Sequence, residues 1–255
     1  MPTILLRADH GDRPPDVLLV DDPELAARAA GLLDTSPERA GIIAAHRGLA
    51  AFSGEWADHP VTIQTTGVGS PAVAMVVEEL LMVGARRFVR VAPAMAVAPW
   101  LHIGGAVVAV SASAVDGTSQ TYLGGLPLAP IADFGLVCAL VHAARAAGVS
   151  VHTGGVATVD VPPDTARLRK LAASGILATD LGTSPLFVLA ARASVQARPG
   201  DRVRAAAILW IDQPATRADS PASGDPLDDL IRIALAALIG PDPWGELPAQ
   251  LDAGR

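Results

Sequence analysis

The sequence predicts a single α/β domain in which a mixed, mostly parallel and twisted β-sheet is flanked by helices. Short aliphatic or β-branched runs alternate with longer runs of helical periodicity along most of the 255 residues. Apolar residues make up 51% of the chain and charged residues 18%, which is enough apolar material for a sizeable core and argues against disorder. No internal repeat divides the chain. We therefore assign residues 1–255 to one domain, with a Pro-rich tail that starts at about residue 240 and contains Trp244.

The expected elements follow from local patterns, taken in chain order. Short apolar runs predict strands at residues 3–6, 16–20, 61–66, 86–91, 106–111, 149–156, 176–179 and 205–211, and residues 42–52 hold a further apolar alternation. Apolar positions three to four residues apart predict helices at residues 24–33, 72–84, 133–148, 163–174, 184–195 and 226–238. Pro-, Gly- and Ser-rich segments at 196–202 and 214–225 are typical of loops, and we expect the second to form a flexible flap.

One stretch organises these elements. Residues 65–71 read Thr-Thr-Gly-Val-Gly-Ser-Pro and separate an apolar strand from a helix that begins near Pro71. Proline is tolerated in the first helical turn, because the N–H that it lacks would have no partner there. Glycines at such a junction let backbone N–H groups approach a ligand, and a helix N-terminus favours an oxygen-rich one. The stretch therefore predicts a ligand site at this end of the sheet.

Charge and composition limit the function classes. The formal net charge is −7 and the pI is near 5.3, so we expect no nucleic-acid partner. No run of about 18 apolar residues and no signal peptide is visible, so we expect no membrane association and a cytoplasmic location. The single Cys138 lies in an apolar helical pattern and is interpreted as a buried small hydrophobe. The six histidines show no ligand spacing, so no metal site is expected.

The motif at residues 65–71, with Glu79-Leu80 near the helix end, resembles the signature of the nucleoside phosphorylase family, which includes purine nucleoside and uridine phosphorylases. A second match is Asp-Gly-Thr-Ser at 116–119, followed by Tyr122, and it resembles the uridine and archaeal purine branch. The resemblance implies a nucleoside phosphorylase-like fold and an enzyme of the pentosyltransferase or N-glycosidase type. It also implies a nucleoside as the ligand and a homo-oligomer, either a dimer or a trimer of dimers. No cofactor is implied, and inorganic phosphate is a possible co-substrate.

The resemblance also assigns roles to individual residues. It implies that Arg90 binds phosphate from a strand and that Arg47 binds it across a subunit interface. Asp212, at the end of an apolar strand, matches the aspartate that protonates a purine base as general acid. The nucleoside-binding positions are Val68, Asp180, Leu181 and Gly182.

Three departures from the family pattern affect the expected phosphate and sugar sites. Asp21 stands where a glycine holds phosphate, and a carboxylate there would repel a dianion. Pro93, which has no N–H, lies in a turn that otherwise binds phosphate. Gly182 replaces the glutamate that holds the sugar hydroxyls.

These departures leave several functions open. The first prediction is cleavage of the N-glycosidic bond of a nucleoside by glycosyl transfer. One alternative is a phosphate-independent nucleosidase, in which Asp21, Asp22 or Glu24 activates water, and this places Asp21 with Asp212 as a catalytic candidate. Another alternative is a non-catalytic nucleoside-binding or regulatory homologue. A third is an enzyme that acts on an unusual nucleoside or another small molecule. The identity of the base stays open.

Overall fold

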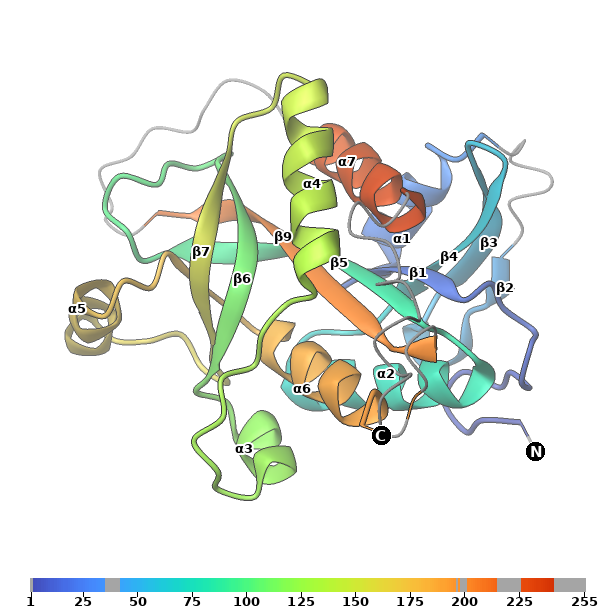
Figure 1. Ribbon diagram of the computed structural model, residues 1–255, viewed down its shortest axis with the longest axis horizontal. Coiled ribbons are helices and arrows are strands. Elements are labelled where there is room, and N and C mark those ends of the chain that lie inside the picture. Colours follow the sequence, from blue (N-terminus) through green and yellow to red (C-terminus); the bar gives the residue numbers. More distant parts are fainter. Residues whose placement is uncertain (1, 35–41, 196, 198–200, 215–225, 241–255) are drawn as a thin grey trace, which may run out of the picture.

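Nine strands form one continuous sheet in the computed structural model, which describes residues 2–34, 42–195, 197, 201–214 and 226–240 (Figure 1). The strand order is β2-β3-β4-β1-β5-β8-β7-β6-β9. The strands are β1 (Asp16–Val20), β2 (Ile42–Ala44), β3 (Ala51–Trp56), β4 (His59–Thr65), β5 (Arg87–Ala96), β6 (Ala106–Ala114), β7 (Val151–Thr158), β8 (Ala178–Asp180) and β9 (Arg204–Gln213).

Parallel and antiparallel pairings are mixed in this sheet. β1 pairs in parallel with β4 and β5, and β7 does so with β6 and β8. β9 runs antiparallel to β6 and also pairs in parallel with β5, so β5, β8, β7, β6 and β9 close into a ring. β1, β4, β3 and β2 extend the sheet beyond this ring. The predicted mixed α/β fold is confirmed.

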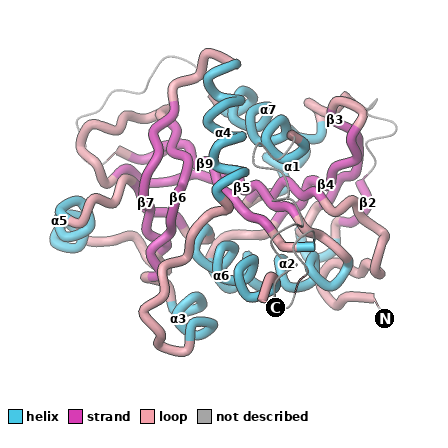
Figure 2. Tube along the Cα trace, in the orientation of Figure 1, coloured by secondary structure: helices cyan, strands magenta, loops and turns pink. Residues whose placement is uncertain are grey.

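Helices cover both faces of the sheet (Figures 1 and 2). α1, α4 and α7 pack on one side, and α2, α3 and α6 pack on the other, with a separate apolar core on each side. α5 lies at one end, beyond β7. The helices are α1 (Pro23–Ala30), α2 (Ser70–Val83), α3 (Gly117–Leu123), α4 (Phe134–Ala146), α5 (Thr165–Ala173), α6 (Thr183–Ala193) and α7 (Leu227–Ile239). Among the described residues, no helix is long and apolar enough to span a membrane.

Several local predictions differ from the structure. β5 continues through Pro93 to Ala96, where a turn was expected. Residues 3–6 do not form a strand, because their backbone N–H groups turn towards a side chain of α2 instead of a neighbouring strand. α3 was not predicted, because its sequence Gly-Thr-Ser-Gln-Thr-Tyr-Leu lacks an apolar period; Asp116 nevertheless caps it by accepting from the Ser119 N–H. The tail after residue 240, the expected flap and most of the loop at 196–202 lie outside the described residues.

The carboxylate of Glu79 on α2 holds the N-terminal segment in place. It accepts hydrogen bonds from the backbone N–H groups of Ile4, Leu5 and Leu6, at 2.8–3.0 Å. Partial burial of this carboxylate favours its neutral form, but the backbone N–H donors outweigh that effect and lower its pKa below the ordinary value.

A Glu79→Gln variant is expected to lower the melting temperature at neutral pH, because an amide presents only one acceptor oxygen to these donors. The lowered pKa in the folded state means that the stabilisation by Glu79 is present above the unfolded pKa and disappears as the pH falls through the folded value. The difference in melting temperature between wild type and variant should therefore close at acidic pH. Glu78→Gln is the matched control, because an amide oxygen can still accept from the Tyr122 hydroxyl. A difference that is independent of pH would contradict this account.

Candidate active site

A cavity of about 210 Å³ lies where several strands end next to the glycine-containing loop. β1 and β4 run in parallel, so Asp21 and Asp22, which follow β1, lie beside the loop that follows β4. β5 contributes its second half, β8 its C-terminal end, and β9 its last residues. The lining residues are Asp21, Asp22, Val68, Pro93, Ala94, Met95, Val159, Pro162, Thr179, Asp180, Leu181, Asp212 and Gln213. Five of the eight predicted site residues thus line one cavity, and Arg47, Arg90 and Gly182 do not.

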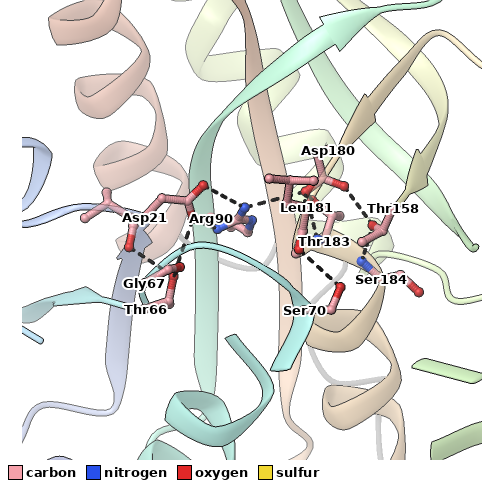
Figure 3. A network of polar contacts seen from close by, with 12 residues as sticks. Asp21, Thr66, Gly67, Ser70, Arg90, Thr158, Asp180, Leu181, Thr183 and Ser184 are labelled. Atoms are coloured by element: carbon pink, nitrogen blue, oxygen red, sulfur yellow. Dashed lines mark hydrogen bonds and ion pairs between the residues drawn. The ribbon is translucent and has the colours of Figure 1, made fainter. Parts of the chain in front are cut away.

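Arg90 is fully buried behind this lining and is paired with carboxylates of the chain itself (Figure 3). Its Nη1 binds Asp21 Oδ1, and its Nη2 lies 3.1 Å from Asp21 Oδ2 and 3.6 Å from Asp180 Oδ2. Burial opposes the charged guanidinium, but the two carboxylates outweigh it and raise the Arg90 pKa above its ordinary value. The resemblance gives Arg90 the role of binding phosphate, but its guanidinium is paired with Asp21 instead. Asp21 is the residue that stands where the family pattern has a glycine.

Asp180 is the centre of a buried network at the start of α6. Its Oδ1 accepts from the Thr158 hydroxyl at 2.7 Å. Its Oδ2 accepts from the Gly182 N–H at 3.0 Å and from the Thr183 N–H and hydroxyl at 2.8 and 2.6 Å. A carboxylate at a helix N-terminus satisfies N–H groups that have no partner within the helix. Both oxygens are therefore engaged in positioning α6, although Asp180 also borders the cavity.

Gly182 is packed so tightly that a side chain does not fit there. An ideal Cβ at this position would lie 2.6 Å from Val73 Cγ2 and 3.1 Å from Arg90 Nη2. Its φ of −160° is ordinary extended backbone, so the restriction comes from packing. Asp21 and Asp180 hold the Arg90 guanidinium against Gly182. The two departures from the family pattern at Asp21 and Gly182 therefore lie in contact with the same side chain.

The loop at residues 66–69 takes the conformation that its glycines predict. Gly67 and Gly69 have φ values of 77° and 99°, a region that favours glycine. Thr66 Oγ1 lies 2.8 Å from the Gly67 carbonyl and 3.4 Å from Asp21 Oδ1, and the Ser70 hydroxyl donates to the Leu181 carbonyl at 3.1 Å. The loop is thus held against the two polypeptide segments that follow β1 and β8. Val68, between the two glycines, is 66% exposed and contributes an apolar surface to the cavity.

Two further carboxylates are accessible at the cavity, unlike those of Asp21 and Asp180. Asp22 is exposed, and its Oδ1 caps α1 by accepting a hydrogen bond from the Leu25 N–H. None of the described residues donates a hydrogen bond to its Oδ2. Asp212 is exposed at the end of β9, where desolvation by its neighbours raises its pKa, opposed by a hydrogen bond from its own backbone. A raised pKa makes a carboxyl group a better proton donor near neutral pH. The structure therefore places two accessible carboxyl groups at this cavity, and the pKa of Asp212 is raised.

Arg47 lies on a short 3₁₀ turn (His46–Gly48), where it is exposed and has a left-handed φ of 54°. It is not part of the cavity lining. Its predicted role across a subunit interface stays a prediction.

Some residues of the site were missed from the sequence. Thr158 and Thr183 complete the network around Asp180, and their signal is a hydroxyl residue at a strand end and at a helix start. Met95, Thr179, Pro162 and Gln213 also line the cavity, although no local motif marks them. The described residues contain no group of three His, Cys, Asp or Glu side chains placed to hold a metal ion.

The comparisons with known proteins agree with this geometry. Residues 15–238 match the family model described as the phosphorylase superfamily. A DeoD-type purine nucleoside phosphorylase of Jannaschia sp. is 29% identical over 243 residues, which cover 92% of this chain and 98% of the relative. The uridine phosphorylase of Thermococcus kodakarensis is 35% identical over 150 residues (59% of this chain), and that of Escherichia coli is 32% identical over 139 residues (54% of this chain). This chain spans about half the length of these two uridine phosphorylases, at 52% and 53%.

The match over residues 15–238 covers the first strand, the glycine-containing loop, the cavity and the last helix. It confirms the resemblance to enzymes of nucleoside metabolism that the motifs at 65–71 and 116–119 indicated. This chain therefore belongs to the phosphorylase superfamily.

Proposed function

We propose that this protein cleaves the N-glycosidic bond of a nucleoside and that water, not phosphate, is the nucleophile. The observation that supports hydrolysis is the ion pair between Asp21 and Arg90. Arg90 is fully buried and binds both oxygens of Asp21, so it offers no free cation to a phosphate ion. Asp21 and Asp180 would both repel a dianion at that position.

The accessible carboxylates suit a hydrolytic mechanism. As the C–N bond lengthens, positive charge grows on the sugar, and an acidic cavity stabilises it. Asp22 accepts a proton from water, and the water oxygen forms a bond to the anomeric carbon. The electron pair of the breaking C–N bond goes to the base nitrogen, which takes a proton from Asp212. The products are a free base and a free sugar. As in glycoside hydrolysis, one carboxyl group acts as the acid and a second carboxylate acts as the base.

The surroundings of the three acidic residues that could activate water differ, and the differences support Asp22. Asp21 lines the cavity but is held by Arg90, and Glu24, in the first turn of α1, is not part of the lining. Asp22 lines the cavity, and no described residue donates a hydrogen bond to its Oδ2. We therefore assign the base to Asp22, the acid to Asp212 and the positioning of Arg90 to Asp21.

Release of free base from a panel of purine and pyrimidine nucleosides, followed by chromatography with and without phosphate, tests this proposal. We expect release without phosphate, with free sugar rather than sugar phosphate as the second product. Asp22→Asn and Asp212→Asn should each lower kcat by about 10²- to 10⁴-fold. Asp58→Asn, on the exposed β3–β4 turn, is the control, because asparagine tolerates its left-handed φ of 63°. Release that requires phosphate would overturn the proposal.

A non-catalytic, nucleoside-binding role is the second candidate. The observation that favours it is the engagement of both Asp180 oxygens by Thr158, Gly182 and Thr183, next to a glycine that carries no side chain to hold sugar hydroxyls. Binding of nucleosides without release of base in either condition would support this role. A homo-oligomer that uses Arg47 belongs to the proposal on the sequence resemblance alone, and a cytoplasmic location stays a prediction of the sequence.

A further inference from the structure

The charge of the cavity lining is strongly one-sided. Asp21, Asp22, Asp180 and Asp212 line it, and among the described residues no Lys, Arg or His side chain does. Arg90 is the only ion-pair partner that the described residues provide to any of the four, and it lies buried behind Asp21 and Asp180. Asp212 is protonated in its proposed role as acid, so among the described residues the other three carboxylates and this one guanidinium leave two formal negative charges in excess.

The remaining walls of the cavity are apolar. They are formed by Val68, Pro93, Ala94, Met95, Val159, Pro162 and Leu181. A concave site with apolar walls of low dielectric focuses the field of its charges and concentrates ligands of the opposite sign. Apolar walls suit a flat heterocycle, and the excess carboxylates suit one that carries a positive charge.

Such a heterocycle also makes one step of the proposed hydrolysis unnecessary, namely protonation of the leaving base by Asp212. When the base of an N-glycoside is already a cation, the electron pair of the breaking C–N bond neutralises its ring nitrogen, so the leaving group needs no proton. Water then supplies the oxygen of the new bond to the anomeric carbon, and its proton passes to Asp22. The balanced products are a neutral heterocycle, a free sugar and one proton, and no phosphate takes part.

We propose that this cavity selects N-glycosides of positively charged aromatic bases, such as pyridinium or N-alkylated purinium ribosides, over neutral and anionic ones. The inference rests on the proposed hydrolysis, because it names the substrate class of the same site. It concerns the charge of the ligand, which can be measured by binding as well as by turnover.

Matched pairs of small molecules test the charge preference. Nicotinamide riboside carries a pyridinium cation, whereas nicotinic acid riboside has the same cationic ring with a carboxylate in place of the carboxamide, so its base has no net charge. For turnover, we expect kcat/KM of nicotinamide riboside to exceed that of nicotinic acid riboside by at least about tenfold, and the ratio should fall as salt is added. For binding without turnover, 1-methylnicotinamide should bind more tightly than neutral nicotinamide in titration calorimetry.

Variants locate the preference in the cavity. Asp22→Asn and Asp212→Asn should each reduce the binding preference for 1-methylnicotinamide over nicotinamide several-fold, whereas Asp58→Asn should leave it unchanged. Asparagine preserves the cap that Asp22 forms on α1, so loss of folding is not expected to confuse the result.

The outcomes separate this inference from the function on which it rests. Hydrolysis of inosine or uridine with no preference for the cationic probes would overturn the charge preference and leave hydrolysis standing. Preferential binding of 1-methylnicotinamide, with no hydrolysis of any riboside, would support the charge preference and overturn the proposed function. Equal binding of 1-methylnicotinamide and nicotinamide by the wild-type protein would overturn the inference whatever the turnover.

Discussion

Replacement of Arg90 by methionine is expected to lower the free energy of unfolding by about 3–5 kcal/mol, because it leaves two buried carboxylates without a counter-charge. The Asp21 side chain is 7% exposed and that of Asp180 is 0% exposed, so water cannot take over the role of the guanidinium. Urea unfolding followed by circular dichroism measures the change. Methionine has a similar length and no charge, so the experiment reports mainly on the ion pairs.

A second variant distinguishes charge from packing at this position. Combining Arg90→Met with Asp21→Asn removes one of the two uncompensated charges, and we expect it to recover part of the lost stability. Arg86→Met is the matched control, since the partly buried Arg86 side chain hydrogen-bonds the Ala85 carbonyl. It should cost less than about 1 kcal/mol. A double variant no more stable than Arg90→Met alone would mean that the loss arises from packing.

Replacement of Gly182 by alanine is expected to lower the free energy of unfolding by about 1–3 kcal/mol, because the added Cβ overpacks the core. The Cβ would lie 2.6 Å from Val73 Cγ2, and valine is buried here and stiff at χ1. Gly182→Glu should lower the free energy of unfolding more than Gly182→Ala does, because the larger side chain overpacks the same space. We therefore expect that this change alone does not restore the carboxylate that the resemblance implies at this position. Thermal and urea unfolding of both variants measure the effect.

The control for this prediction is Gly117→Ala, at the start of α3. A Cβ at Gly117 would lie 3.5 Å from Asp160 Oδ2, which is an ordinary contact, so its effect on stability should be small. Introducing Val73→Ala into the Gly182→Ala protein should recover part of the loss, because it removes the clashing methyl group. If Gly182→Glu were as stable as the wild type, the tight packing would not explain the glycine.

The Glu79 prediction and the Gly182 prediction involve two different residues of the same helix. Glu79 and Val73 both lie on α2, where Glu79 binds the N-terminal segment and Val73 packs against Gly182. The side chains are six positions apart and share no partner in these contacts. We therefore expect the effects of Glu79→Gln and Gly182→Ala to add.

The sequence by itself determined the elements whose signals are local. The strand, the glycine-containing loop and the helix that begins near Pro71 were predicted correctly. Their signals are β-branched residues, glycines at positive φ and apolar periodicity, and each depends only on residues close in the sequence. Asp21, Val68 and Asp212 were proposed as site positions from the same local order and from the resemblance, and all three line the cavity. Their roles stay predictions. The strand at residues 3–6 was wrong because its partner, the Glu79 carboxylate, lies more than 70 residues away.

Only the tertiary structure decided how the site is charged. Asp21 and Arg90 are 69 residues apart and Asp180 lies another 90 further on, so no local pattern relates them. Their ion pairs form because parallel and antiparallel strands bring the three side chains into one buried space, where an unpaired charge would be unstable. From the resemblance, the sequence predicted separately a phosphate-binding role for Arg90 and departures from the family pattern at Asp21 and Gly182. In the fold, the Asp21 carboxylate forms an ion pair with Arg90. Gly182 packs against Arg90 and Val73 so closely that a side chain does not fit there.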